Sequence, residues 1–573
     1  MSAEVSPVSL GSTGAKKSLF DRLFADPNAI WMREMRQSAR LGRTPWILFA
    51  LTLTISLLMC SIGGIAAAEN TSPANIGGGL FQAFFSVAYF VVVIVGPTVA
   101  ANSVASEREG KTWEAVLLTG LTPKEIARGK FLAAYTTIAL YIVVLAPVGA
   151  LSFLFGGVTA TEVVVAFAFL FLVAGLGVAF GLAVSSLMAS LRGAIVVTLM
   201  LAICIGPTLY SIFGFGCSFA MHKLWNEVPE AFPIWLPLAY SRATFGIEYV
   251  ALLIVLPILL IVVPAWFLYE ATISNLTGEA DDRSSGLKRW FLVSSPLVAM
   301  ACAVPSLIAE VDDDRSGWAI AGVSAYGAYA TFCALLFAFE PAGPSRRVRI
   351  HWDRTGASTL KRFFGPGLMK SSVLVALLGF TGMAAIAAID AVFLEALGTP
   401  VGKEMRLQQI FVYTAYASLF FLFVTGLTAW FRARNNSPWV SRLIASAILF
   451  LISAGPWVVA AIGGALANSH DKDWLVIASP SPFFAFTMVS WLDSTATGNA
   501  PIVECGLGCA MIWGFVGFGL LIGSGRRCAR TVREHDGALA QAEAALLAED
   551  EALAAAAASA AGPVGEDDAR QPA

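Results

Sequence analysis

Long apolar runs separated by short polar segments dominate the chain. About twelve of these runs are near twenty residues or longer, which is the length that a helix needs to cross the hydrocarbon layer of a bilayer. The pattern therefore predicts an all-α polytopic membrane protein with about twelve transmembrane helices. The expected spans lie near residues 46–68, 78–102, 131–156, 160–188, 194–215, 246–270, 290–309, 317–340, 371–393, 408–431, 443–465 and 502–524.

The composition agrees with this fold class. Of the 573 residues, 57% are hydrophobic and only 13% are charged, whereas a soluble domain has about a quarter of its residues charged. The eight cysteines include no Cys-x-x-Cys pair. Cys505 and Cys509 lie one helical turn apart, and we interpret them as small buried residues rather than as a disulfide or metal pair.

The distribution of basic residues sets the expected orientation. If both termini are cytoplasmic, only six of the 37 Lys and Arg residues fall in segments assigned to the outside. The six are Lys223, Arg242, Arg315, Lys403, Arg406 and Lys472. Basic residues concentrate on the inner side of membrane proteins, so we expect a multi-pass protein of the inner (plasma) membrane with both ends in the cytoplasm.

This orientation gives a direct topology prediction. A reporter fused at Arg354 should be cytoplasmic, and one fused at Lys472 should lie outside, because the two positions flank an odd number of expected spans. Enzymatic reporters that are active on only one side of the membrane would measure this. Finding both reporters on one side would contradict the span count between them.

Both ends of the chain differ in character from the spans. Residues 1–25 are expected to be disordered. Asp26 and Pro27 resemble a helix start, and the pattern over 26–45 predicts an amphipathic interfacial helix with Trp31 in the acyl boundary. Its basic face holds Arg33, Arg36, Arg40 and Arg43. The alternative is a plain positively charged flank. The Ala/Glu-rich tail 525–573 predicts a surface helix with a disordered end over 561–573.

A polar segment, "ASEREGKTWEAVLLTGLTPKEIARGK", occupies residues 105–130. Ser106 with Glu109 and Thr122 with Glu125 each fit a capping box. Between them Trp113, Val116 and Leu117 form an apolar stripe, and Gly120 follows where a short helix would end. We expect a short amphipathic helix, a tight turn and a capped helix. Packing beneath its own bundle and docking of a partner both explain such a loop.

This segment resembles the signature of ABC-2 type permeases, the membrane subunits of a class of ABC exporters. The family pattern has a carboxylate-Arg-Glu cluster, then Gly, Thr, Glu, Leu-Leu, Thr-Pro and Gly-Lys. Two further segments, "DPNAIWMREMRQSARLGR" and "LAPVGALSFLFGGVT", are similar to the connecting helix and to the loop after the third span. The likeness covers roughly residues 26–270. The chain departs from the pattern at Lys111 and at Gly120, where the family often has proline.

The resemblance implies that the loop 103–130 couples the spans to a separate ATP-binding subunit, present in two copies, which would hold ATP and magnesium. The implied coupling residues are Glu107, Arg108, Glu109, Gly110, Thr112, Trp113, Glu114, Leu117, Leu118, Thr122, Pro123, Glu125 and Lys130. We expect Glu107 and Glu109 to lie in water. Reversing their charge would then weaken association with the ATPase without unfolding the bundle.

Several functions lack the residues that they need. No Gly-x-x-x-x-Gly-Lys-Ser/Thr run occurs, so this chain is expected to bind no ATP itself and to be no enzyme, with no cofactor of its own. Nothing predicts nucleic-acid binding. The expected spans hold no ionisable residue near their centres, and Glu248, Asp390 and Glu504 fall near outer ends, which disfavours an ion-driven carrier. A twelve-span secondary carrier and a non-transporting scaffold remain the alternatives.

The second half of the chain, 276–524, has a plan like that of 46–275. Each half has two spans, a basic inner loop, three spans, a long outer segment and a final span. The inner loop 341–370 takes the place of the polar segment but lacks its acidic cluster. A diverged duplication and an unrelated six-helix extension both fit this plan. Whether one chain forms the whole pore or two chains form a homodimer stays open, as does the transported substrate.

Overall fold

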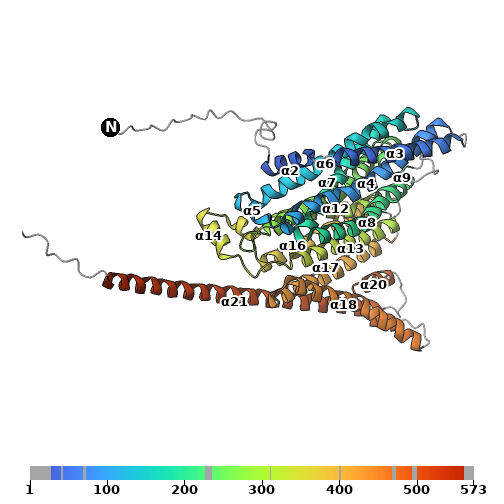
Figure 1. The fold of residues 1–573 in the computed structure, drawn as a ribbon. Coiled ribbons are helices and arrows are strands. Elements are labelled where there is room, and N and C mark those ends of the chain that lie inside the picture. The colour runs from blue at the N-terminus through green and yellow to red at the C-terminus, as the bar shows by residue number, and fades with distance from the viewer. Residues whose placement is uncertain are drawn as a thin grey trace, which may run out of the picture. The chain divides into compact units, whose positions relative to one another are not determined.

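In the computed structural model, residues 28–560 are described except for 41–42, 69–71, 226–234, 310–311, 399–401, 468–472 and 493–499. All regular structure in this described part is helical, and twelve helical stretches are long and apolar enough to cross a membrane. Figure 1 shows these helices as elongated bundles. The expected all-α polytopic fold is confirmed, and each expected span overlaps one of the twelve helical stretches.

The chain divides into two compact units, Met1–Thr277 and Gly278–Ala573. The boundary lies within two residues of the one expected between the two halves. We describe each unit by itself. The helices of unit 1 are α2 (Ala29–Arg40), α3 (Arg43–Ala68), α4 (Pro73–Glu109), α5 (Trp113–Leu118), α6 (Pro123–Leu154), α7 (Ala160–Leu187), α8 (Leu191–Ser211), the π-helix η1 (Ile212–Gly216), α9 (Cys217–Leu224), α10 (Leu236–Arg242), the π-helix η2 (Tyr249–Val255) and α11 (Leu256–Leu276).

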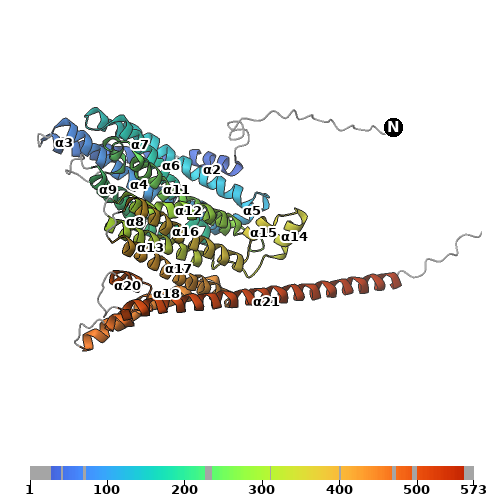
Figure 2. The ribbon, with the colours of Figure 1, turned by 180° about the vertical axis from the view of Figure 1, so that it is seen from behind.

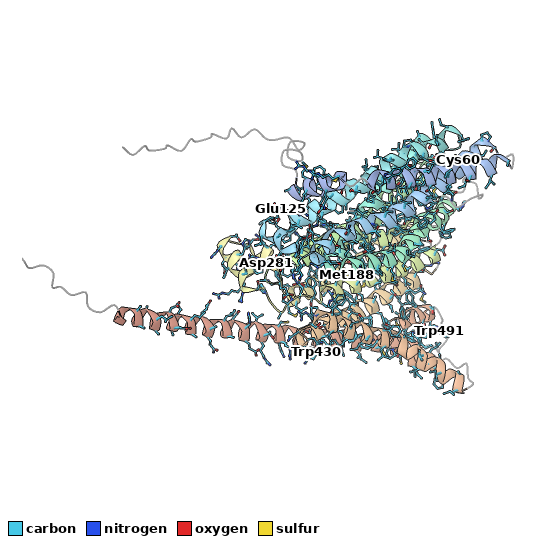
Figure 3. All side chains as sticks on the ribbon, viewed as in Figure 1. Cys60, Glu125, Met188, Asp281, Trp430 and Trp491 are labelled. Atoms are coloured by element: carbon cyan, nitrogen blue, oxygen red, sulfur yellow. The ribbon has the colours of Figure 1, made fainter. Side chains whose placement is uncertain are left out.

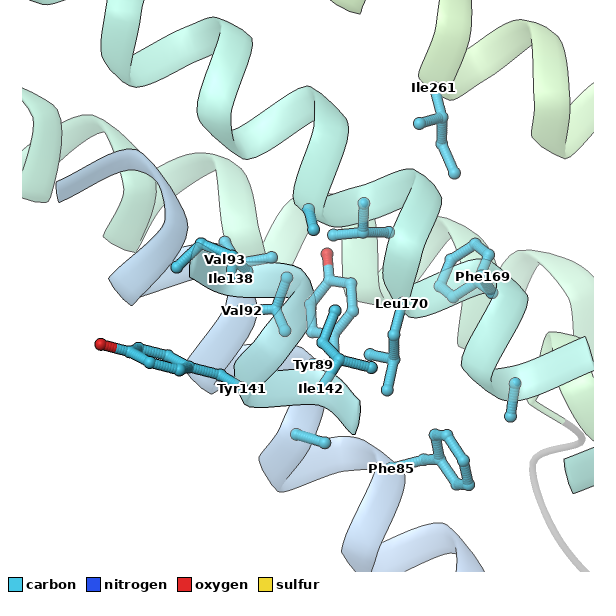
Figure 4. Close-up of a cluster of buried hydrophobic side chains, with 14 of the residues drawn as sticks. Phe85, Tyr89, Val92, Val93, Ile138, Tyr141, Ile142, Phe169, Leu170 and Ile261 are labelled. Atoms are coloured by element: carbon cyan, nitrogen blue, oxygen red, sulfur yellow. The ribbon is translucent and has the colours of Figure 1, made fainter. Parts of the chain in front are cut away.

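The centre of unit 1 is the packing of α4 against α7. Figure 4 shows Phe85 and Tyr89 of α4 beside Leu170 of α7, within a cluster of buried apolar side chains. The two backbones approach closely, because a Cβ at Gly181 would lie only 2.0 Å from the Pro97 carbonyl oxygen. Small residues allow this distance between membrane helices. A side chain at position 181 would therefore force α4 and α7 apart.

The described part of unit 2 contains ten helices, and one of them, α21, is very long. They are α12 (Ser285–Ile308), α13 (Asp312–Phe337), α14 (Arg346–Arg354), α15 (Thr359–Phe364), α16 (Leu368–Leu397), α17 (Lys403–Arg434), α18 (Pro438–Ala467), α19 (Asp473–Ile477), α20 (Phe484–Leu492) and α21 (Ala500–Ala560). Six of them, α12, α13, α16, α17, α18 and α21, contain the candidate spans.

The two units pack their spans in the same order. The second span of unit 1, α4, contacts α3, α6, α7 and α8, and the second span of unit 2, α13, contacts α12, α16, α17 and α18. The fourth span, α7, contacts α6, α8, α10 and α11, and α17 correspondingly contacts α16, α18, α20 and α21. Whether this shared order comes from a diverged duplication or from an unrelated extension stays a question of the sequence plan.

The tail forms a helix, as expected, but it continues the last span without a break. Figure 2 shows α21 as one rod, and it runs from Ala500 to Ala560. Two ion pairs hold its polar half against α14: Arg349 with Asp536 (2.9 and 2.6 Å) and Arg346 with Glu543. The hydrogen bonds with Asp536 raise the pKa of the Arg349 guanidinium, even though slight burial opposes this. Residues 561–573 lie outside the described part, as do 1–27.

The cysteines and outer carboxyl groups mostly follow expectation. Cys505 and Cys509 are free and half-buried. Glu248 and Glu504 are exposed near the start of their helices. Asp390 differs, because it is fully buried and accepts a hydrogen bond from Ser306 of α12. Asp390 thus lies near the end of α16, as expected, but inside unit 2 rather than at its surface.

Candidate functional site

The loop between α4 and α6 carries α5 at one end of unit 1 (Figure 1). Figure 3 shows Glu125, which belongs to the first turn of α6, at this end, and Cys60 of α3 at the opposite end. The connection is short. Helix α4 ends at Glu109, Gly110 is its C-cap residue, and the chain turns through Lys111, whose φ is 56°. Thr112 then caps α5 by its position, although its side chain makes no capping hydrogen bond.

One of the two predicted capping boxes is wrong and the other is confirmed. Ser106 lies inside α4, where its hydroxyl donates to the Asn102 carbonyl (2.5 Å), because α4 continues past it to Glu109. At the start of α6, the Thr122 hydroxyl accepts from the Glu125 N–H (3.3 Å), and the Glu125 carboxylate accepts from the Thr122 N–H (2.8 Å). Pro123 follows as the first helical residue.

Four charged side chains from three helices meet beside the loop. Glu107 of α4 pairs with Arg33 of α2 and with Lys130 of α6, whose Nζ lies 2.9 Å from the Glu107 carboxylate. Glu34 of α2 pairs with Arg33 (2.9 Å) and lies 3.5 Å from the Lys130 Nζ. We call Arg33, Glu34, Glu107 and Lys130 the charge ring. Two cations alternate with two carboxylates, so its net charge is zero.

The charge ring is an internal structure of unit 1. The Lys130 side chain is 0% exposed and that of Glu107 is 13% exposed, and Lys130 also donates to the Ser103 carbonyl (2.8 Å). Partial burial lowers the pKa of the Arg33 guanidinium, but its hydrogen bonds with Glu34 and Glu107 outweigh this, so the pKa is raised above its usual value. The expectation that Glu107 lies in water is wrong, because α2 and α6 supply its partners.

Two further charged residues fix the loop to the end of α7 and to the start of α8. The Arg108 guanidinium donates to the Ser186 carbonyl (2.7 Å) and lies 5.7 Å from the centre of the Trp113 ring, within range of a cation–π contact. Glu109 is exposed, as expected, but its carboxylate accepts from the Leu191 N–H (2.7 Å). The acidic and basic residues that begin the loop therefore anchor it to its own unit.

The tip of α5 remains at the surface. Leu118 is 88% exposed and Leu117 is 45% exposed, whereas Val116 is buried and Trp113 is half-buried. The predicted stripe is thus divided, with Trp113 and Val116 facing the unit and Leu117 facing away beside Leu118. We call the exposed residues Lys111, Glu114, Leu117 and Leu118 the α5 tip.

Helix α2 packs on α6 more closely than an interfacial helix would require. It begins after Asn28, whose side-chain oxygen accepts from the backbone N–H of Ile30 (3.0 Å). The Trp31 indole is half-buried and donates to the Thr136 hydroxyl of α6 (3.3 Å), and its place in the acyl boundary stays a prediction. Arg36 and Arg40 are exposed. Asp26, Pro27 and the side chain of Arg43 lie outside the described part.

The corresponding loop of unit 2 is built around the same turn. Thr119-Gly120-Leu121-Thr122 follows α5, and Thr355-Gly356-Ala357-Ser358 follows α14. The first threonine of each donates to a carbonyl of the preceding helix, Val116 (2.6 Å) or His351 (2.7 Å). Each glycine is left-handed, with φ of 74° and 57°. The hydroxyl of the last residue, Thr122 or Ser358, accepts a hydrogen bond from the backbone N–H three residues later (3.3 Å in both).

A buried ion pair that the sequence analysis missed holds this second loop. The Lys288 Nζ lies 3.4 Å from the Glu340 carboxylate and donates to the Gly365 carbonyl (2.7 Å), and Glu340 accepts from the Gly367 N–H (2.8 Å). Glu340 follows the second apolar run of unit 2, as Glu107 follows that of unit 1. This matching position could have identified Glu340 from the sequence. The exposed apolar residues of the second loop include Leu360 (69%) and Ile350 (40%).

Within the described residues, no group of His, Cys, Asp or Glu could hold a metal ion. The chain's relation to known proteins adds no assignment, because no protein-family model matches it and no curated protein has significant similarity to it. The chain is an all-α membrane protein whose described part holds twelve candidate spans and two loops built around the same turn.

Proposed function

We propose that the chain is the membrane-spanning permease subunit of an ATP-driven ABC exporter, and that the α5 tip docks on a separate ATP-binding subunit. The observation that carries this proposal is the exposure of Leu117 and Leu118 on a loop that is otherwise anchored at every turn. A loop that only packed beneath its own bundle would turn these leucines inward, as it does Val116. Exposed apolar residues rimmed by charges are typical of a protein–protein contact.

The anchoring of the loop suits a coupling role. Force applied at the α5 tip would pass through Arg108 to the end of α7, through Glu109 to the start of α8, and through the capped start of α6. The α4–α7 contact at Gly181 extends the same rigid path into the bundle. A flexible loop would absorb the movement of a partner, whereas this one would transmit it to three spans.

The repeated turn and the repeated packing order support a chain that contains two permease halves. Each half then presents one loop, the α5 tip in unit 1 and the exposed part of α14 and α15 in unit 2. Two copies of the ATP-binding subunit would be served by one chain, so a homodimer is not needed. We place both loops and both termini in the cytoplasm, with the protein in the inner (plasma) membrane, on the distribution of basic residues.

Replacing Leu118 with aspartate tests this proposal. Because Leu118 is 88% exposed, the change should leave the fold intact. At a docked interface it would remove the burial of one leucine, about 2 kcal/mol, which corresponds to roughly thirtyfold weaker association. The measurement is co-purification with an ATP-binding protein from the cells that make this chain, together with the thermal unfolding of the permease.

Leu553→Asp provides the matched control, because Leu553 is 62% exposed on the tail of α21 and belongs to unit 2, not to the α5 tip. It should retain the partner in full. Retention of the partner by Leu118→Asp would show that the α5 tip does not dock, and failure of the unaltered chain to bind any ATP-binding protein would refute the exporter itself. Uptake driven by a pH difference alone would favour the secondary carrier.

A further inference from the structure

A polar groove lies between α2, α4 and α6 of unit 1, next to the charge ring. Its volume is about 800 Å³, which is in the range of pockets that hold small-molecule ligands. Arg33, Glu34, Glu107 and Lys130 all contribute to its wall. We call this cavity the α2 groove.

The α2 groove continues along candidate membrane spans with a polar lining. Thr98, Asn102 and Ser106 are spaced four residues apart on α4, which places them on one face of that helix. Thr98 lies eleven residues before the end of α4 at Glu109, or about 16 Å along the helix axis. On the facing helix, Thr137 and Tyr141 of α6 line the same cavity, and Figure 4 shows Tyr141 pointing away from the apolar cluster behind it.

Such a stripe is costly against lipid. Polar side chains within a membrane span normally face a partner, water or a ligand. A second lateral cavity of unit 1, between α6, α7 and α11, shows the contrast, because it is lined by residues such as Phe131, Leu132 and Trp266 with Arg128 as its one charged residue. The two cavities therefore suit different occupants, and only the α2 groove suits a polar one.

Beyond the charge ring, in which Arg33 stays half-exposed, the polar groups of the α2 groove are neutral. The carboxamides of Gln37 and Asn102 are exposed, and no other group in the described part of the chain hydrogen-bonds to either. The hydroxyls of Thr98, Ser106 and Thr137 donate to carbonyls of their own helices (3.0, 2.5 and 3.0 Å), which leaves their oxygens free to accept. A carboxamide both donates and accepts, so the lining matches a ligand that does the same.

The charge ring disfavours a ligand with net charge. A phosphate near Arg33 would also approach Glu34 and Glu107, and an ammonium group near either carboxylate would also approach Arg33. Lys130 is already enclosed by Glu107 and the Ser103 carbonyl. A ligand with a net charge would be attracted by the two ring residues of opposite charge and repelled by the two of like charge. Hydroxyl groups carry no net charge and are not repelled in this way.

We propose that the α2 groove binds an uncharged, hydroxyl-rich group of the sugar or polyol class. The group could be carried on a lipid or be free in solution, and both share this chemistry. As the substrate class of the exporter, this inference rests on the proposed function. The binding itself does not, because every residue that carries it belongs to unit 1 and no ATP-binding partner is involved.

A cysteine reporter in the groove tests the binding. The Thr137→Cys chain would be placed in phosphatidylcholine nanodiscs and treated with a membrane-impermeant maleimide, and labelling at position 137 would be followed by peptide mass spectrometry, which separates it from the native cysteines. We expect labelling, because the groove is open. Glucosyl-diacylglycerol in the disc, or maltose in solution, should slow the labelling, whereas phosphatidylglycerol should not.

The two sugar probes separate the two sources, since slowing by glucosyl-diacylglycerol alone indicates a lipid-linked group and slowing by maltose indicates a free one. Adding Asn102→Leu to the reporter chain should weaken binding of the protective probe roughly fivefold, as expected for one lost hydrogen bond. Lys124→Cys, on the exposed first turn of α6, serves as the control and should label at the same rate with every probe.

Three results would overturn the inference. Labelling that no sugar probe slows would show a hydrated crevice without a ligand. Protection by phosphatidylglycerol equal to that by the sugar probes would show an anion site. Protection that survives Asn102→Leu unchanged would show that the sugar binds elsewhere. None of these results bears on docking of the α5 tip, and loss of the partner in the Leu118→Asp experiment would not depend on them.

Discussion

Replacing Glu107 with glutamine is expected to lower the free energy of unfolding of unit 1 by about 3 kcal/mol, the lower end of the cost of breaking a buried ion pair. The reason is Lys130, whose side chain is 0% exposed and whose ammonium group lies 2.9 Å from the Glu107 carboxylate. Without that carboxylate, the cation keeps the Ser103 carbonyl and a 3.5 Å approach to Glu34. The half-exposed Arg33 contributes little, because water replaces its partner.

Thermal unfolding of the full chain in detergent would measure this loss. Glu114→Gln is the matched control, since Glu114 is an exposed residue of the α5 tip, and we expect its transition to stay where it is. Replacing Lys130 with methionine in the Glu107→Gln chain should recover part of the loss, because it removes the buried cation. A Glu107→Gln transition indistinguishable from that of Glu114→Gln would mean that the charge ring is solvated and does not hold α2, α4 and α6 together.

This expectation reverses one that the sequence alone suggested. A motif rich in Glu and Arg between two apolar runs is typical of a solvated loop, and nothing near Glu107 in the sequence identifies its partners. Arg33 precedes it by an entire candidate span and Lys130 follows it beyond α5. Charge pairing over such separations depends on how the helices pack. Any loss of partner binding by a Glu107 variant must therefore be separated from loss of the fold.

Local features of the fold, by contrast, were accessible from the sequence. The span lengths follow from the thickness of the bilayer, and the capped start of α6 follows from Thr122, Pro123 and Glu125, which act on one another within a single turn. The same reasoning failed for Ser106, because a capping motif cannot show whether the preceding helix has already ended. Here α4 extends through the motif to Glu109.

In the sequence, the two halves resemble each other only in the order of their spans and loops. Thr119-Gly120 and Thr355-Gly356 are short matches that have no weight until their surroundings are seen. In the structure each follows a loop helix, carries a left-handed glycine and precedes a hydroxyl-capped helix start. A turn that needs a positive φ favours glycine, so the two loops share this turn while the charges around it differ.

The largest effect is expected in unit 2, where Glu340→Gln should lower the free energy of unfolding by about 4 kcal/mol. Glu340 and Lys288 are both buried, with side chains 0% and 1% exposed, so no water replaces the lost charge. Glutamine can still accept from the Gly367 N–H, which isolates the effect of the charge from that of the hydrogen bond. Lys370 and Arg432 also interact electrostatically with Glu340 and would lose its attraction.

Adding Lys288→Met to the Glu340→Gln chain tests whether the lost stability comes from the buried cation. If the cost arises from an isolated buried cation, the double variant Lys288→Met with Glu340→Gln should be more stable than Glu340→Gln alone, even though it has lost more contacts. Glu395→Gln supplies the control, since Glu395 is 68% exposed in its pair with Lys403 and such a surface pair contributes about 0–1 kcal/mol. A double variant less stable than the single one would locate the stabilisation in the packing of the Lys288 side chain under Gly365, and the role of the ion pair in holding the second loop would be wrong.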